Sequence, residues 1–370
     1  MDAYDLMDEG VLAILSKAED PRDKRGKVHS IEVLLAIAIC TYLSNGNTFE
    51  EMECFAEEHE AWLRKHIGME SAPCADTFNR LFQALKPESM VQLLQEVSER
   101  LRKNAGAVKT IAVDGKTLRG SAKGGKSIHV LNAWASGARL SIGQLAVESK
   151  SNEITHVPQL LQSLDLKGCI VTADALNTQV STIQTIVQGK GDYVLPLKAN
   201  HPTHQSVVSA IMRDIATTRE PDFEQVEKGH GRLETRRCWV TSDLSLFLEK
   251  DKWPKLRTLV RIDRARRLAD GRETTETALF LSSLPADAPT IANAVRQHWG
   301  VENQCHWCLD VVFREDACRA RLRNAARNLS ALRVLCLNLL RHSTLRGSLR
   351  IKRLRLAFNP SLLETLLASV

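Results

Sequence analysis

The chain has 370 residues, 44% of them hydrophobic and with a formal net charge of +6, which supports a folded protein of one to three domains with a buried core. Its longest apolar run, 31–43, is shorter than the roughly 20 residues that a bilayer-spanning helix needs, which argues against a membrane protein. The acidic N-terminus lacks the features of a secretory signal, and the nine cysteines are scattered, most of them in apolar segments. We therefore expect a cytoplasmic chain with reduced cysteines.

The first hundred residues are predicted to be helical. Helix-start signals occur at Ser30, at Thr48 with Glu51 as a capping box, at Asp76 and at Pro87. The second helix is expected to run toward His66 and end at Gly68, the third to end at Leu85, and the fourth to continue toward Lys103. The spacing allows a helix-turn-helix, and it leaves open whether this part reads DNA or only packs.

From Lys109 the pattern changes to strands. The predicted order is strand 110–116, strand 128–136, strand 140–149, a helix from Asn152 or Thr155 to Leu164, strand 169–175, helix 178–188 and strand 192–199. The first three strands should form an antiparallel meander, and helical crossovers should make the later strands parallel. This is the order of the RNase H-like fold.

A different block follows, between His201 and about Pro285, with candidate antiparallel strands at 231–240, 256–263 and 273–284 and a candidate linker at Thr217 to Pro221. Helix is expected again from Thr290 to Trp307, and a long amphipathic helix studded with arginines from about Ala317 to His342. We therefore predict an N-terminal helical domain with a DNA-binding role (1–106), an RNase H-like α/β domain with a mixed sheet (107–200 and 286–370), and an inserted β-rich subdomain (201–285).

Three acidic residues carry the predicted chemistry. Asp114 and Asp174 each follow an apolar strand, and the carboxyl ends of neighbouring parallel strands meet at one sheet edge. Glu302 lies in a segment predicted to be helical. Taken singly, each has an ordinary explanation, namely a turn aspartate, a helix N-cap and a surface glutamate. Together they supply the oxygen ligands for two divalent cations, and such ligands favour Mg²⁺ or Mn²⁺ over zinc.

The motifs around these residues also resemble a known family. IAVDGKTLRGS, VTADALNTQ, YVLPLKANH, GHGRLETRR and RQHWGVENQCHWCLDVVFREDACRAR are similar to the DDE transposases of bacterial insertion sequences, in particular the H-repeat-associated branch, and the similarity spans nearly the whole chain. The resemblance implies that Asp114, Asp174 and Glu302 are the catalytic trio. The wider family often carries a Tyr, Arg, Glu, Lys signature, from which this sequence departs at Val295, His298 and Leu309. The departure leaves the excision route, with or without a hairpin, undefined.

The basic residues indicate a nucleic-acid partner. Between Arg319 and Arg355 the sequence has eleven Lys or Arg and no Asp or Glu, and Arg319, Arg323 and Arg327 recur every four residues, as on one helical face. The other candidate DNA contacts are Lys116, Arg119, Lys198, Arg232, Arg236, His298 and Trp299.

Several residues near Glu302 are expected to have structural roles. Core packing is expected for Trp299 and Trp307, structural burial for Cys305 and Cys308, and salt bridges to the following arginines for Asp310 and Asp316.

The predicted function is two-metal cleavage at transposon ends, followed by attack of the freed 3′-OH on target DNA. The resemblance implies DNA partners, namely terminal inverted repeats and target DNA, a homodimer in a synaptic complex, and a location at the bacterial nucleoid. Two alternatives stay open. One is an RNase H-fold DNA endonuclease without joining activity, and the other is a non-catalytic, transposase-derived DNA-binding protein.

Overall fold

The computed structural model describes residues 10–23, 25, 27–103, 109–122, 124, 127–148, 153–229 and 231–370. The chain divides into two compact units. Unit 1 comprises Met1–Ala107, Gly115–Asn152 and Val301–Val370, and unit 2 comprises Val108–Asp114 and Glu153–Gly300. The predicted helix start at Asn152 lies outside the described residues. Within the described part, no helix is both long and apolar enough to span a bilayer.

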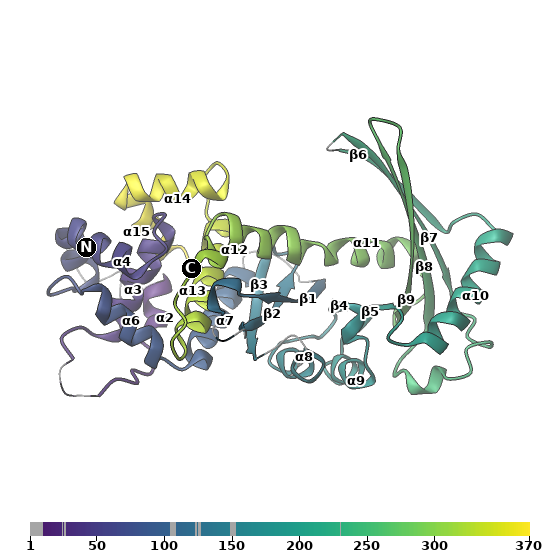
Figure 1. Ribbon diagram of the computed structural model, residues 1–370, viewed down its shortest axis with the longest axis horizontal. Helices are drawn as coiled ribbons and strands as arrows, with labels where there is room; N and C mark the ends of the chain where they lie inside the picture. Colours follow the sequence, from purple (N-terminus) through teal and green to yellow (C-terminus); the bar gives the residue numbers. More distant parts are fainter. Residues whose placement is uncertain are drawn as a thin grey trace. The chain divides into compact units, whose positions relative to one another are not determined.

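Unit 1 is mainly helical (Figure 1). Its helices are α2 (Gly10–Leu15), α3 (Ile31–Leu43), α4 (Phe49–Glu58), α5 (Glu60–Ile67), α6 (Ala75–Ala84), α7 (Pro87–Lys103), α12 (Trp307–Val311), α13 (Ala325–His342), α14 (Leu349–Phe358) and α15 (Pro360–Ala368). The predicted helix signals at Ser30, at Thr48 with Glu51, at Gly68 and at Pro87 are confirmed. The N-terminal helical part is therefore encoded largely by local capping chemistry.

Two expectations for these helices were wrong. The predicted second helix is broken at His59 into α4 and α5. Asp76 does not cap α6, which begins one residue earlier, at Ala75. The Ala75 amide instead donates to the Glu53 carboxylate of α4 at 2.9 Å. A contact from another helix thus satisfies a helix-terminal N–H group that the sequence alone assigned to a local cap.

The long C-terminal helix also differs from the prediction. It begins at Ala325 rather than Ala317, and almost every residue as far as Leu340 is buried, so it is a core helix and not an amphipathic surface helix. The segment before it packs closely on Gly120, where an added Cβ would lie 2.1 Å from the Cys318 carbonyl oxygen. Arg323 there has φ 48°, in the left-handed region.

Several residues of the predicted basic segment are structural. Arg333 of α13 is buried and donates to the Tyr42 hydroxyl at 3.0 Å. Arg353 of α14 is also buried, and its guanidinium donates to the Tyr42 and Gly46 carbonyls, both at 2.8 Å, and to the Val312 carbonyl. The basic segment was predicted to suit phosphate contact, and these two buried arginines do not take part in it.

Arg353→Met should accordingly destabilise the protein without weakening DNA binding. The substitution leaves buried carbonyls without a donor, at a cost of about 1–3 kcal/mol for each unsatisfied group. Chemical denaturation would measure the stability and a salt titration would measure DNA affinity. The exposed Arg350→Met, one turn away on α14, is the matched control. Equal stability of the two variants would contradict a structural role for Arg353.

The strands confirm the predicted mixed sheet. The sheet strands are β1 (Thr110–Thr117), β2 (His129–Ala135), β3 (Leu140–Val147), β4 (Ile170–Ala173), β5 (Asp192–Leu197), β6 (Phe223–Gly229), β7 (Arg232–Thr241), β8 (Thr258–Leu268) and β9 (Glu273–Ser282). The strand order is β3-β2-β1 in unit 1 and β1-β4-β5-β9-β8-β7-β6 in unit 2. As predicted, β2 and β3 are antiparallel, and β4 is parallel to both β1 and β5. The chain order with the intervening helices α8 (Glu153–Gln162) and α9 (Val180–Gln188) is that of an RNase H-like fold.

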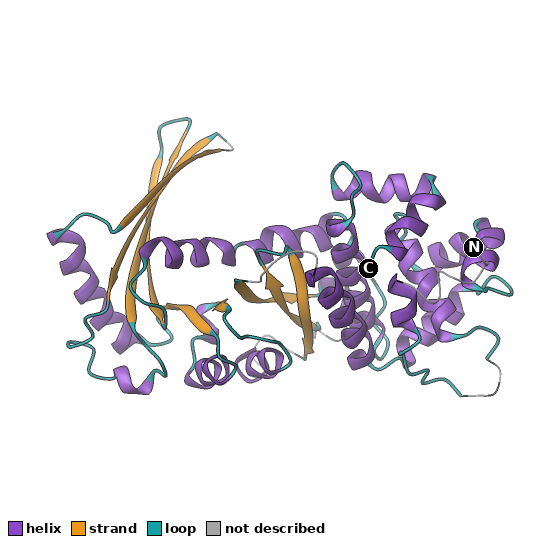
Figure 2. Cartoon of the chain, turned by 180° about the vertical axis from the view of Figure 1, so that it is seen from behind, coloured by secondary structure: helices purple, strands orange, loops and turns teal. Residues whose placement is uncertain are grey.

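The inserted block of unit 2 forms four long antiparallel strands, β6 to β9, seen as the curved ribbons in Figure 2. The sequence analysis missed β6 and the helix α10 (Pro202–Thr218). The helix α11 (Ala288–His298) packs on one face of the sheet, against Val260 and Ile262 of β8, and α10 contacts the same strands (Figure 1). Coverage by two helices explains why β8 is buried at consecutive residues of its first half.

Candidate functional site

Two predicted acidic residues stand at one edge of the unit 2 sheet. β1 and β4 are parallel neighbours with Val113 opposite Ala173, so Asp114 and Asp174 each follow a register-matched pair. Asp114 lies inside β1, so its explanation as a hairpin-turn aspartate was wrong. Asp174 does occupy the N-cap position of the short 3-10 helix that follows it, but its side chain makes no capping hydrogen bond there. The Asp174 side chain is 54% exposed, which leaves its carboxylate accessible to a ligand.

His298, the last residue of α11, lies beside Asp174. Its Nδ1 atom is 3.1 Å from the Thr172 hydroxyl of β4, and its Nε2 atom is 3.8 Å from an Asp174 carboxylate oxygen. Ile291 and Val295 precede it on the same helical face and are buried against the sheet. The apolar stripe of α11 therefore directs His298 onto β4, where its ring contacts both the strand and the aspartate.

In unit 1, Glu302 lies in a π-helix, Val301–His306, and not in a regular α-helix. Its side chain is 57% exposed, whereas His306 at the end of the same segment is 4% exposed. The two side chains are joined by a contact of 3.2 Å between His306 Nδ1 and a Glu302 carboxylate oxygen. The ring of the buried His306 thus holds the carboxylate of the exposed Glu302 in place. π-Helical turns are frequent at functional sites.

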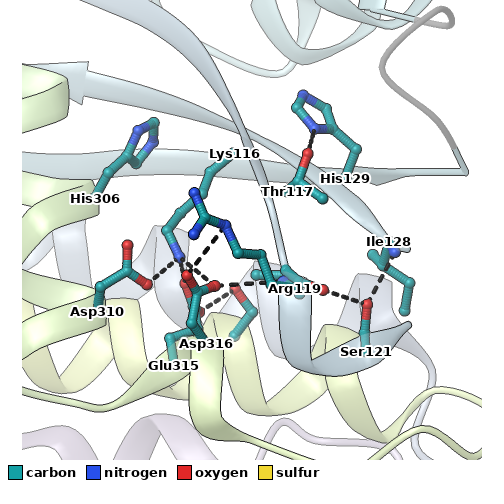
Figure 3. A network of polar contacts seen from close by, with 12 residues as sticks. Lys116, Thr117, Arg119, Ser121, Ile128, His129, His306, Asp310, Glu315 and Asp316 are labelled. Carbon is teal, nitrogen blue, oxygen red and sulfur yellow. Dashed lines mark hydrogen bonds and ion pairs between the residues drawn. The ribbon is translucent and has the colours of Figure 1, made fainter. Parts of the chain in front are cut away.

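Lys116 of β1 is the centre of a polar cluster in unit 1 (Figure 3). Its ammonium is 2.8 Å from Glu315 and 2.5 Å from Asp310, and its side chain is only 9% exposed. Burial disfavours the ammonium, but Glu315 and Asp310 outweigh it and raise the pKa of Lys116 above its ordinary value. Lys116 is therefore a charged residue bound to carboxylates.

The acidic members of this cluster correct one prediction. Asp310 and Asp316 form ion pairs as expected, but with Lys116 and with Arg119 rather than with the arginines that follow them in sequence. Burial is also the main cause that raises the pKa of Asp310, while Lys116 opposes the rise. Lys116 of β1 and Arg119, which follows that strand, replace the local partners because the fold brings them to Asp310 of α12 and to Asp316.

The remaining predicted DNA contacts fall into two groups. Exposed residues are Arg119, Lys198, Arg319 and Arg323. The others are partly engaged: Arg232 and Arg236 pair with Glu234, and Arg327 is half-buried on α13. The prediction that Arg319, Arg323 and Arg327 share one helical face was wrong, since only Arg327 lies in a helix.

The aromatic residues near Glu302 were expected in the core, and that expectation was also wrong. Trp299 is 50% exposed and Trp307 is 55% exposed. In unit 2 the Arg264 guanidinium lies 5.6 Å from the Trp299 ring centroid. Cys305 and Cys308 are buried as expected, and burial raises the pKa of both thiols. They are poor thiolate ligands for that reason.

Sequence reasoning missed His306 and the polar residues behind it. The available signals were its position four residues after Glu302 in a helical segment, and two amide side chains, Asn132 and Gln144, within otherwise apolar strands. Buried polar groups of this kind need partners, so they point to a network.

Two protein families match this chain. A family described as "Transposase DDE domain" matches residues 108–339, and one described as "DDE_Tnp_1-associated" matches residues 12–96. The chain is 32% identical to the "Putative transposase YncI" of Escherichia coli O157:H7, over 98% of the chain and 95% of that protein. It is 31% identical to the "H repeat-associated putative transposase YhhI" of E. coli K12, over 92% and 93%.

A third relative, the "Uncharacterized protein in dhlA 3'region" of Xanthobacter autotrophicus, is 36% identical over 72% of the chain and 92% of its own length. The fold and these matches define an RNase H-like nuclease or transferase enzyme that acts on DNA. The chain belongs to the DDE transposase family, and the predicted resemblance to its H-repeat-associated members is confirmed.

Proposed function

We propose that the protein cleaves DNA at the ends of a transposable element and joins the freed 3′-OH to target DNA, with Asp114, Asp174 and Glu302 as its catalytic carboxylates. The observation that carries the proposal is the edge of the unit 2 sheet, where two aspartates follow paired residues of adjacent parallel strands. The chain passes from unit 2 to unit 1 immediately after Asp114 and again just before Glu302. Two of the three carboxylates therefore stand within two residues of a crossing point.

The donor set suits divalent cations with a preference for oxygen. All three residues offer carboxylates, and Asp174 and Glu302 are more than half exposed. Carboxylate oxygens favour Mg²⁺ or Mn²⁺, and two such ions would activate the attacking oxygen and stabilise the leaving one. The protein's own contribution is to hold these side chains rigidly, Asp114 within a strand and Asp174 directly after one.

Neighbouring residues would position the DNA. The exposed Arg119, Arg319 and Arg323 of unit 1 are suited to backbone phosphates, as is Lys198 of unit 2. Trp299, half-exposed beside Arg264, offers a face on which an unstacked base could lie. Because joining needs two element ends at once, we propose a homodimer as the working assembly. We also propose that the domains are divided as predicted, after residues 106, 200 and 285.

Strand transfer separates this function from that of a simple nuclease. The purified protein is mixed with a duplex that carries a pre-cleaved element end with a 3′-OH, a supercoiled plasmid and Mg²⁺. The end sequence is taken from short inverted repeats that flank the gene. We expect plasmid joined to the duplex, and no joining when the same duplex ends in a 3′-deoxy nucleotide. Cleavage of an intact end without any joined product would support the endonuclease alternative.

A further inference from the structure

A chain of buried hydrogen bonds runs behind Glu302 through unit 1. Its residues are His306 of the π-helix, Asn132 of β2, Gln144 of β3, Ser330 of α13, Glu315 and Lys116. The five residues from His306 to Glu315 are each at most 4% exposed. Asn132 and Gln144 stand directly opposite each other in the antiparallel β2–β3 pair. Polar side chains buried at this depth are costly unless every one of them is satisfied.

The donor and acceptor roles along these hydrogen bonds are set by Glu315, at the end far from Glu302, and Gln144 donates to both of its neighbours. Glu315, bound to the Lys116 ammonium at 2.8 Å, accepts the Ser330 hydroxyl proton at 2.9 Å. Ser330 has a single hydroxyl proton, so its oxygen can only accept from the Gln144 amide, at 3.3 Å. The other Gln144 N–H donates to the Asn132 carbonyl oxygen at 3.2 Å. The Asn132 amide nitrogen is therefore turned toward His306.

These donor and acceptor roles fix the tautomer of the His306 ring. The Asn132 amide lies 3.3 Å from His306 Nε2, and an amide N–H donates, so Nε2 must accept. The ring proton of neutral His306 is then on Nδ1, which lies 3.2 Å from the Glu302 carboxylate. With Nε2 accepting, the neutral ring donates its Nδ1–H to the Glu302 carboxylate. The residue is built to hold a carboxylate.

We propose that His306 is a positioning residue for Glu302, and that the buried chain from Lys116 through Asn132 fixes the Nδ1–H tautomer of its ring. The inference rests on the proposed catalytic role of Glu302. The chain ends at Lys116, two residues after Asp114 on the same strand, so one network supports the surroundings of two of the three proposed carboxylates. Such outer partners typically change metal affinity about 10–100-fold when removed.

The tautomer can be read without metal or DNA. Protein with ¹⁵N-labelled histidine rings should give the Nδ1–H pattern for His306, with the signal assigned through its loss in His306→Gln. Gln144→Met breaks the chain with little change in volume, and it should convert part of the His306 population to Nε2–H. Gln83→Met is the matched control, because Gln83 also donates to an asparagine, Asn79 on α6, outside the chain. An Nε2–H ring in the unmodified protein would overturn the proposal.

Metal affinity and turnover provide a second readout. Gln144→Met should weaken Mn²⁺ binding by about 10-fold, measured by calorimetry, and Gln83→Met should not. Ser330→Ala cuts the same chain at α13 and serves if Gln144→Met fails to fold. His306→Gln, which keeps one donor and one acceptor, should retain more cleavage than His306→Leu. Equal Mn²⁺ affinity in all variants would overturn the positioning role. Full cleavage by Glu302→Gln would instead refute the proposed function and leave the tautomer result standing.

Discussion

Asp174→Asn is expected to reduce cleavage of an element end by about three orders of magnitude or more, equivalent to roughly 4 kcal/mol of lost transition-state stabilisation. The amide keeps the shape of the side chain and removes the charge that would hold a divalent cation. Because Asp174 is 54% exposed and makes no capping bond, the fold should be unaffected. Single-turnover cleavage in Mg²⁺ and in Mn²⁺, together with thermal unfolding, would measure both effects.

The other two carboxylates should behave alike, because a site of this kind acts as a unit. Asp114→Asn and Glu302→Gln are expected to lose cleavage to a similar extent, and a double variant should be little worse than either single one. Asp165→Asn and Glu57→Gln, exposed residues of unit 2 and unit 1, are the matched controls. Normal function of the Asp114 or Glu302 variant would favour the non-catalytic DNA-binding alternative.

The sequence predicted the strands around Asp114 and Asp174 correctly, because the signal there was local. Asp114 and Asp174 follow β-rich runs, and parallel pairing of β1 with β4 is what a helical crossover dictates. The helix caps at Ser30 and Thr48 were likewise encoded within a few residues. The helix α10 was missed because only Val208 and Met212 of its seventeen residues are buried, which leaves a weak periodic signal.

Prediction failed where long-range contacts decide the outcome. Arg333 and Arg353 belong to a run of positive charge, and only the packing of α3 against α13 and α14 shows that they are core residues bound to backbone and tyrosine oxygens. Similarly, the tautomer of His306 depends on Asn132 and on residues up to 190 positions away in sequence. No window of sequence contains that information, because it arises from strand register and helix packing.

Lys116 is the residue for which the sequence and the structure suggest the most different roles. Its position two residues after Asp114 suggested a DNA contact, and that role remains a prediction. Its ammonium nevertheless lies in a buried cluster with Glu315 and Asp310 (Figure 3). Removing one partner of a buried ion pair leaves an unpaired charge, which typically costs about 3–5 kcal/mol. A phosphate contact at the surface would instead leave stability nearly unchanged and alter the salt dependence of DNA binding.

Lys116→Met is therefore expected to lower the free energy of unfolding by about 3–5 kcal/mol, measured by urea denaturation in the absence of DNA. Adding Glu315→Gln should restore part of this loss, because the buried carboxylate that lost its cation is then neutral. Lys167→Met, at an exposed lysine of unit 2 with no proposed DNA contact, is the control for a change of charge alone. A stable Lys116→Met protein with a shallower salt dependence of DNA binding would show that Lys116 contacts a DNA phosphate. Loss of stability, with rescue by Glu315→Gln, would show that the Lys116 ammonium stabilises the fold, where it is bound to the network that reaches Glu302.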